Sequence, residues 1–251
     1  MLAAGAVRTR ALTAGGGAAA FGIGTLTYAS GELPFTLVLL AFFLPSVALS
    51  RLGRARKRAL IDVGKSGPRD ALQVLANGGV ATACAVAFAR TRDQRWARAF
   101  AGAYAAATAD TWATEIGTLA RGRPRSIFTL RPVATGISGG VTAAGTAAEF
   151  AGAAWLSLCA LVCLRTPARP AGVRDLLTVA AAGVAGASVD SVLGGSLQEL
   201  RYCAACDRAC ETNPHACGAP TVAVRGVPGV SNDIVNLLAT VAGAALAFTL
   251  K

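Results

Sequence analysis

The sequence predicts an all-α, polytopic membrane protein, and two observations support this fold class. Of 251 residues, 54% are hydrophobic and only 15% are charged. The apolar residues form long blocks of Ala, Gly, Leu and Val rather than short periodic patches, and about 20 such residues suffice to cross a bilayer as a helix. We therefore expect a single integral membrane domain over residues 1–251.

Windows of this length predict about seven transmembrane helices. They cover residues 11–30, 33–50, 70–90, 97–119, 136–164, 173–198 and 231–250. The first has an alternative interpretation, because Arg8 and Arg10 followed by an apolar run also describe a signal peptide. Its Gly-rich stretch has no convincing cleavage site, so we expect the helix to be retained. Without it the count is six.

The net charge of +11 is unevenly distributed along the chain. With seven helices and an internal N-terminus, most of the 24 Lys and Arg residues fall on one side, which carries the loops 51–69, 120–135 and 199–230. Cytoplasmic loops of membrane proteins show this excess. We expect these loops to face the cytoplasm from the cell membrane, and some of their charges to orient the protein and contact lipid headgroups rather than nucleic acid.

Carboxylates stand inside the apolar segments. Glu149, in the middle of the 136–164 segment, matches no partner that the sequence identifies. Three others are considered together: Asp110 and Glu115 in ADTWATEIG, and Asp190 in SVDSVLGGSLQ. An unpaired carboxylate in hydrocarbon is costly, so such residues usually face a protein interior or a cavity. The predicted topology places all three toward the cytoplasmic ends of their helices. The polar residues expected at the same level are Arg69, Gln73, Asn77, Asn232, Asp233 and Asn236.

Carboxylates beneath cations are typical of phosphoryl or nucleotidyl transfer, because carboxylates hold Mg²⁺ and cations hold phosphate. Lys65, Arg69 and Arg131 in the flanking loops are candidate phosphate ligands. VGKSGPR is not a Walker motif, since Ala59 stands where that motif needs Gly, but its turn still exposes N–H groups. In the alternative interpretation, each acid neutralises an arginine or caps a helix, and Asp233 fits a cap well.

The cysteines fall into two groups. Those inside predicted helices are expected to behave as small hydrophobes. Cys203, Cys206, Cys210, His215 and Cys217 crowd into one loop on the reducing side, where disulfides are a poor explanation. Cys203-x-x-Cys206 followed by His215-x-Cys217 predicts a structural zinc site with four ligands. Two alternatives remain: Cys210 replaces His215 or Cys217 as a ligand, or the thiols are unligated.

The ordered motifs GKSGPRDALQVLANGG, AGAYAAATADTWATEIG, RPVATGISGGVTAAG, SVDSVLGGSLQ and SNDIVNLL resemble the integral membrane family known as domain of unknown function 92. The likeness runs from about residue 50 to the C-terminus. The family includes the chloroplast phytyl-phosphate kinase. The resemblance implies a kinase that adds a second phosphate to an isoprenoid monophosphate using a nucleoside triphosphate, with CTP suggested by the plant enzyme.

The resemblance and the residue chemistry together assign expected roles. Asp110, Glu115 and Asp190 are expected to hold Mg²⁺ as the catalytic carboxylates. The residues expected to bind substrate or phosphate are Lys65, Arg69, Asn77, Arg131, Gln198, Asn232, Asp233 and Asn236. Two other classes stay open: a membrane cytidylyltransferase, which would release pyrophosphate, and a secondary transporter, which would place its carboxylates near the midplane with paired broken helices.

Overall fold

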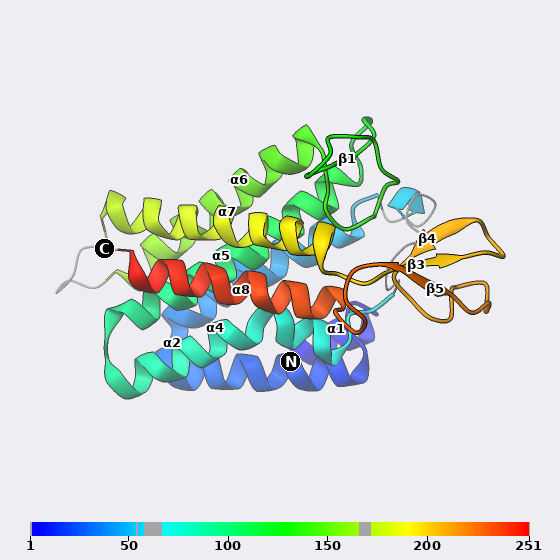
Figure 1. The fold of residues 1–251 in the computed structure, drawn as a ribbon. Coiled ribbons are helices and arrows are strands. Elements are labelled where there is room, and N and C mark those ends of the chain that lie inside the picture. The colour runs from blue at the N-terminus through cyan, green and yellow to red at the C-terminus, as the bar shows by residue number, and fades with distance from the viewer. Residues whose placement is uncertain (1, 54, 58–66, 166–171, 251) are drawn as a thin grey trace.

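The structure is a computed structural model that describes residues 2–53, 55–57, 67–165 and 172–250. Long helices lie side by side, and most of the connecting loops gather at one end of the bundle (Figure 1). The helices are α1 (Leu2–Arg8), α2 (Ala14–Arg51), α4 (Ala71–Thr91), α5 (Gln94–Gly117), α6 (Ala143–Leu164), α7 (Val173–Ser196) and α8 (Asn232–Thr249).

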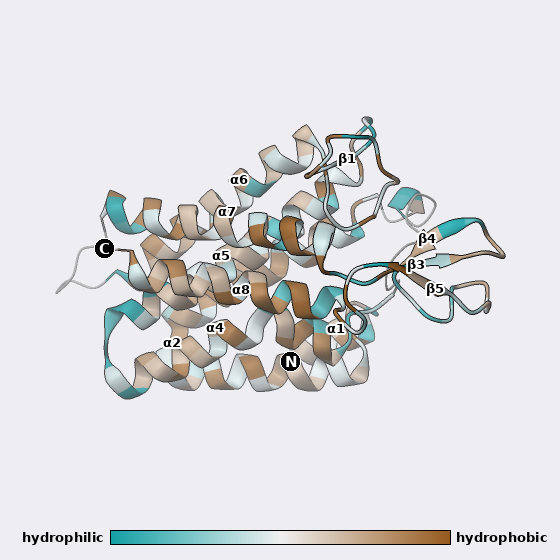
Figure 2. Cartoon of the chain, viewed as in Figure 1, coloured by the Kyte–Doolittle hydropathy of each residue, from teal (hydrophilic) through white to brown (hydrophobic). Residues whose placement is uncertain are grey.

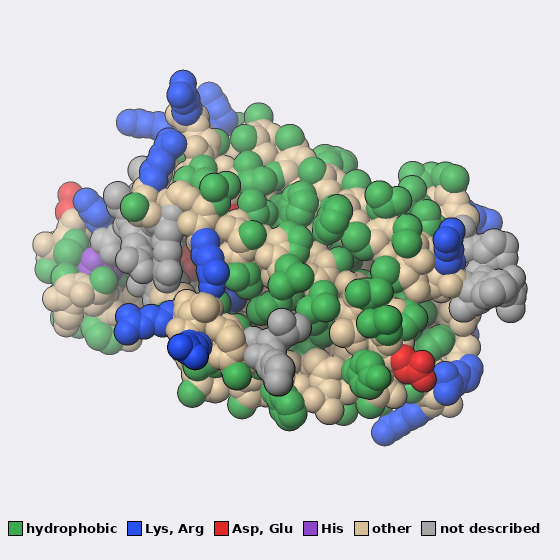
Figure 3. Space-filling view, turned by 180° about the vertical axis from the view of Figure 1, so that it is seen from behind, with side chains coloured by type: hydrophobic (Ala, Val, Ile, Leu, Met, Phe, Trp, Pro, Cys, Tyr) green, Lys and Arg blue, Asp and Glu red, His purple; other side chains and the backbone are tan. Residues whose placement is uncertain are grey.

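Five of the described helices, α2, α4, α6, α7 and α8, are long and apolar enough to cross a membrane. The 21 residues of α4 extend about 32 Å, close to the roughly 30 Å of a bilayer's hydrocarbon core. Large apolar side chains such as Phe21, Phe150 and Leu177 are exposed on the helices. Pale to brown colours run along the helices in Figure 2, and in Figure 3 hydrophobic side chains cover the middle of the face while Lys and Arg lie mostly toward the two ends. A polytopic membrane protein is confirmed, while the count of seven stays a prediction.

Helix α2 reverses direction at Glu32, whose backbone is non-helical (φ 53°, ψ −145°). A straight helix of 38 residues would separate its ends by about 57 Å. Both ends instead contact Arg69: the Thr13 N–H donates to the Arg69 carbonyl oxygen (3.0 Å), and Arg69 Nη2 donates to Ser50 Oγ (3.3 Å). Pro34 lies in the first turn of the second half, where its missing N–H costs nothing. The two halves match the separate helices expected at 11–30 and 33–50.

Helix α5 lies at the centre of the bundle. It contacts α2, α4, α6, α7 and α8, and almost every residue from Ala97 to Thr111 is buried. Small residues allow this close packing, since a Cβ added to Gly102 would lie 2.5 Å from the Gly243 carbonyl oxygen of α8. Because protein rather than lipid surrounds α5, it can be rich in Ala. Its low hydropathy follows from that position.

The expectation of an all-α fold is wrong for two loops. The 199–230 loop forms a three-stranded antiparallel sheet in the order β4-β3-β5, from β3 (Leu200–Cys203), β4 (Arg208–Cys210) and β5 (Val222–Arg225). The pair β1 (Arg125–Ser126) and β2 (Gly140–Val141) forms a second, smaller sheet. Both sheets lie at the end of the bundle where the loops gather (Figure 1).

Helix α6 begins seven residues later than the 136–164 segment predicted. Gly136 and Gly139 have positive φ (91° and 80°), which favours a turn over a helix. Thr142 then caps α6, because its Oγ1 accepts from the Gly145 N–H (3.0 Å). A Cβ on Gly139 would lie 2.3 Å from Gly195 Cα, so glycine lets this turn pack directly on the end of α7.

Candidate active site and a Cys/His cluster

A cavity of about 1050 Å³ lies at the loop-bearing end of the bundle. One part of its wall is apolar and comes mainly from α2, with Ile23, Leu39, Phe42, Phe43 and Val47. The other part is polar and comes from the ends of α4, α5, α7 and α8, the start of α6 and the adjoining loops. The cavity therefore offers one apolar region and one charged region to a ligand.

The structure brings most of the expected site residues to this cavity. Those lining it are Arg69, Asn77, Asp110, Glu115, Asp190, Gln198, Asn232, Asp233 and Asn236. Arg131 does not line it and is exposed on the loop after β1. Lys65 lies outside the described residues. Asp70 caps α4, since its Oδ1 accepts from the Gln73 N–H (2.9 Å) in a reciprocal capping box.

Three carboxylates lie at one depth inside the bundle. Asp110 of α5 and Asp190 of α7 are six or seven residues from the loop-bearing ends of their helices, and Glu149 of α6 is six residues from its start. This spacing puts all three about 10 Å inside the cavity end. Glu149, which matched no partner in the sequence, accepts from Ser188 Oγ (3.3 Å) and lines the cavity.

Asp190 belongs to a carboxylate cluster, which we define as Asp110, Glu149, Asp190 and Glu211. Its Oδ2 is buried and has no hydrogen-bond partner among the residues that the structure describes. The other three carboxylates all act on it electrostatically. A buried carboxylate oxygen among like charges is an arrangement that a cation would stabilise.

Glu211 joins the cluster from the 199–230 loop, and the sequence analysis missed it. Ser138 Oγ donates to Glu211 Oε1 (2.6 Å). Burial raises the pKa of Glu211, and the hydrogen bond from Ser138 acts in the opposite direction. The signal available in the sequence was its place next to Cys210, in the loop already singled out for its cysteines.

Glu115 is already paired with a cation. Lys57 Nζ donates to Glu115 Oε2 (2.5 Å), and Ser50 Oγ donates to Glu115 Oε1 (2.5 Å). Both side chains of the Lys57–Glu115 pair are largely buried, with 9% and 18% of their surface exposed. Burial lowers the pKa of Arg69, while the carboxylates of Glu115 and Asp110 act to raise it. Lys57 is thus a cavity cation that sequence reasoning missed.

The carboxylates do not converge on a single preformed ion site. Among the described residues, one group of three or more His, Cys, Asp or Glu residues has ligand atoms that all lie within 4.8 Å of one another. Its members are Cys203, Cys206, His215 and Cys217. Asp110, Asp190 and Glu149 offer the hard oxygen ligands that Mg²⁺ prefers. Glu115, the third expected ligand, is engaged in its ion pair with Lys57.

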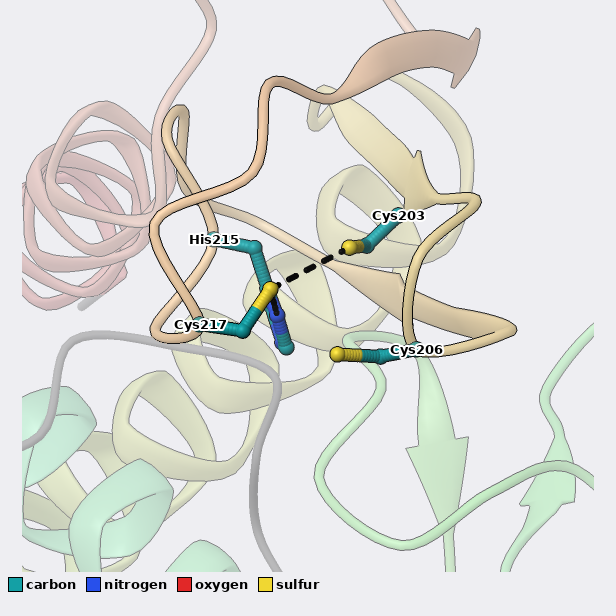
Figure 4. Close-up of side chains that lie close together, drawn as sticks. All are labelled: Cys203, Cys206, His215 and Cys217. Carbon is teal, nitrogen blue, oxygen red and sulfur yellow. Dashed lines mark hydrogen bonds between the residues drawn. The ribbon is translucent and has the colours of Figure 1, made fainter.

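The Cys/His cluster, defined as Cys203, Cys206, His215 and Cys217, lies on the three-stranded sheet (Figure 4). Cys203 ends β3, Cys206 lies in the turn before β4, and the other two follow in the connection to β5. The Sγ atoms of Cys203 and Cys217 are 3.7 Å apart, and His215 Nδ1 is 3.2 Å from Cys217 Sγ. The alternative in which Cys210 replaces one of these ligands is not the arrangement seen, because Cys210 lies outside this group, with its Sγ 3.6 Å from the Thr212 carbonyl oxygen.

Two thiols of the Cys/His cluster have pKa values shifted in opposite directions. The pKa of Cys217 is lowered to about 6, chiefly by its hydrogen bond with His215. The pKa of Cys206 is raised to about 11, chiefly by its hydrogen bond with Cys217. A thiol of lowered pKa next to other thiols and an imidazole is the kind of donor set from which a soft metal ion displaces protons.

The helical bundle, its apolar surface and its polar cavity define an integral membrane protein with a buried, charged site at one end. The chain belongs to the family described as integral membrane protein DUF92, whose model matches residues 1–244. The match starts at the N-terminus, so the likeness extends about 50 residues further than the motifs indicated. The family model therefore covers the sequence of α1 and α2 as well.

Two relatives cover most of this chain. Protein PGR of Arabidopsis thaliana is 29% identical over 255 residues, with 92% of this chain and 86% of that protein covered. An uncharacterised membrane protein of Methanocaldococcus jannaschii is 28% identical over 210 residues, with 83% and 73% covered. An uncharacterised membrane protein of Synechocystis is 33% identical over 144 residues, which is 56% of each chain. No solved structure matches this chain.

Proposed function

We propose that this protein is a membrane-embedded prenyl-phosphate kinase. It transfers the terminal phosphoryl group of a nucleoside triphosphate, with CTP the first candidate, to an isoprenoid monophosphate such as phytyl phosphate. The observation that carries the proposal is the two-part cavity, whose apolar wall from α2 continues into a charged region. Its volume of about 1050 Å³ lies just above the roughly 300–1,000 Å³ typical of ligand pockets.

The two regions suit the two parts of such a substrate. The isoprenoid chain lies against Leu39, Phe42 and Phe43, where burying apolar surface contributes about 25 cal/mol per Å². The monophosphate then extends toward Arg69 and Lys57. Two phosphate-bearing substrates meet there beside the carboxylate cluster.

The reaction needs little proton transfer. An oxygen of the acceptor monophosphate attacks the terminal phosphorus of the triphosphate. A new P–O bond forms, the bond to the bridging oxygen breaks, and the nucleoside diphosphate leaves. When both reactants are fully ionised, the charges balance without a general base. The protein's contribution is positioning and charge neutralisation, as in other phosphoryl transfers.

Several polar groups of the cavity have distinct tasks in this scheme. Arg69 and Lys57 neutralise phosphate oxygens, and Lys57 exchanges Glu115 for phosphate when the substrates bind. Asn77, Asn232 and Asn236 orient phosphate oxygens or the nucleotide. Asp110, Asp190 and Glu149 would hold Mg²⁺, which supplies charge neutralisation between the phosphates. The fit rests on the buried Asp190 Oδ2, which has no hydrogen-bond partner among the described residues.

The orientation follows from the same scheme. The two halves of α2 together with α4, α5, α6, α7 and α8 account for seven crossings of the cell membrane. The cavity end, which carries the basic loops 51–69 and 120–135, faces the cytoplasm, where nucleotides are available. The nucleotide then enters from water and the isoprenoid from the bilayer.

The test is a reconstitution with labelled nucleotides. Detergent-purified protein is incubated with CTP or ATP labelled in the terminal phosphate, Mg²⁺ and a panel of prenyl monophosphates. A kinase moves the label to a prenyl diphosphate and forms one nucleoside diphosphate per turnover. Release of pyrophosphate with formation of a cytidylyl lipid would identify a cytidylyltransferase instead.

Transport is tested in sealed vesicles. Uptake of a labelled prenyl phosphate without change in its phosphate content would replace the kinase proposal with transport. A transporter of that kind would have paired broken helices beside its site, whereas the one break among the described helices is that of α2 at Glu32. The lack of a second broken helix among them favours the kinase.

A further inference from the structure

The three-stranded sheet is too small to hold its own shape by apolar burial. Its strands contain four, three and four residues. Val222 and Val224 of β5 are 61% and 57% exposed, so the sheet buries little apolar surface there. Modules of this size usually need a metal, a disulfide or another covalent link. The Cys/His cluster is where such a link would act.

The cluster already has dimensions close to those of a tetrahedral zinc site. With Zn–S bonds of about 2.3 Å, two thiolates on one zinc ion lie about 3.8 Å apart. The Cys203–Cys217 separation is 3.7 Å, and all four ligand atoms lie within 4.8 Å of one another. Cys203 and His215 are buried, which excludes water from one side of the site. His215 directs Nδ1 toward Cys217.

The same sheet forms part of the cavity wall. Glu211, the residue after β4, receives the hydrogen bond from Ser138. Arg225 of β5 donates to the Gly194 carbonyl oxygen at the end of α7 (3.1 Å) and to the Ser138 carbonyl oxygen (3.4 Å). Glu199 accepts a hydrogen bond from the Gly229 N–H (2.8 Å). Gly229 lies two residues before Ser231, the N-cap residue of α8. These bonds connect the sheet to α7, α8 and the 135–142 turn.

We propose that Cys203, Cys206, His215 and Cys217 bind one Zn²⁺ ion, and that this ion holds the sheet in the position that places Glu211 and the 135–142 turn at the cavity. The zinc is structural, with four protein ligands and no open position for a substrate. Its loss frees β3–β5 and releases Ser138 from Glu211. This inference concerns the fold of the cavity wall and does not depend on which reaction the cavity carries out.

The first experiment measures metal content. Protein purified in detergent without chelator is expected to contain about one zinc per chain, and Cys203→Ser combined with Cys206→Ser is expected to lose it. The matched control is Cys159→Ser with Cys163→Ser on α6, which changes two cysteines outside the cluster and should keep the zinc. Cobalt substitution of the wild type should give the visible absorption of a tetrahedral, sulfur-rich site. A metal-free protein, or one with a disulfide within the cluster, would overturn the proposal.

The second experiment measures the link to the cavity in the absence of any substrate. Zinc is removed from the wild type with a chelator, and hydrogen–deuterium exchange is followed by mass spectrometry. Exchange should rise in residues 199–230 and also in the 135–142 turn, and trypsin should then cleave after Arg208. Restoring zinc should reverse both effects. If zinc leaves and the 135–142 turn exchanges as before, the ion does not position the cavity wall and that part of the proposal fails.

Discussion

Replacing Asp110 with asparagine should separate stability from activity. Asp110 lies inside the bundle with Glu149 and Asp190 at the same depth, and Glu149 acts on it electrostatically. The amide keeps the size of the side chain and its capacity to hydrogen bond but removes the charge. Arg69 still has Glu115 beside it, so no cation is left without an acid. The variant should therefore fold.

The substitution is expected to lower the reaction rate but not the stability. Loss of a charged contact to the transition state costs roughly 3 kcal/mol, which is about a hundredfold in rate. Relief of like-charge repulsion should leave stability unchanged or higher. About 1 kcal/mol of added stability would raise the melting temperature by about 2–4 °C in a chain of this length.

The assay is prenyl-phosphate phosphorylation by detergent-purified variants with matched size-exclusion profiles, together with thermal melting in the same detergent. Asp190→Asn should behave like Asp110→Asn. The double variant should be little worse than either single variant, because residues that act as one unit are not additive. Glu149→Gln should also lose activity, since Glu149 lines the cavity beside them.

The control is Asp93→Asn, at the opposite end of the same helix. Asp93 caps α5 through the Arg95 N–H (2.9 Å), and asparagine caps about as well. This variant should keep near-normal turnover. Near-normal turnover in Asp110→Asn would show that the carboxylate is structural. A large fall in its melting temperature would refute the argument from charge repulsion.

Three further predictions follow from particular contacts. Lys57→Met should lower the free energy of unfolding by about 3 kcal/mol in detergent melts, because it removes the cation that is hydrogen-bonded to the largely buried Glu115. The neighbouring Arg56→Met, at an exposed position, should change the free energy of unfolding little, and equal losses in the two variants would contradict the ion-pair argument. Gly102→Ala should cost about 1–3 kcal/mol by separating α5 from α8, whereas Gly79→Ala, where a Cβ meets nothing within 4 Å, should not; equal melting temperatures would show that the contact yields. A cysteine that replaces Arg56 should react with an impermeant maleimide in inverted vesicles but not in intact cells. Labelling of intact cells would show that the orientation is the opposite of the one proposed.

Much of the fold follows from the sequence alone. Apolar blocks of about 20 residues predict membrane helices because bilayer thickness sets their length, and the described helices lie close to the expected ranges. The spacing of polar residues relative to helix ends also predicts their depth. Asp110 and Asp190 were placed toward one end by counting residues, and both line the cavity there.

The proximity of the residues in the Cys/His cluster was predictable for a related reason. Cys203-x-x-Cys206 and His215-x-Cys217 are local pairs, in which one tight turn brings two side chains together whatever the rest of the chain does. The structure needed only to bring the two turns together, and their ligand atoms lie within 4.8 Å. A local spacing of this kind can be recognised without knowing the fold.

The tertiary structure alone decided which charges pair. Lys57 and Glu115 are 58 residues apart, and Ser138 and Glu211 are 73 apart, so no local spacing indicates either contact. Glu149 looked isolated because its neighbours come from α5 and α7, which only helix packing places beside α6. Depth in a membrane helix can be counted along the chain. The direction in which a side chain faces depends on how the helices rotate and pack, and that is a property of the whole bundle.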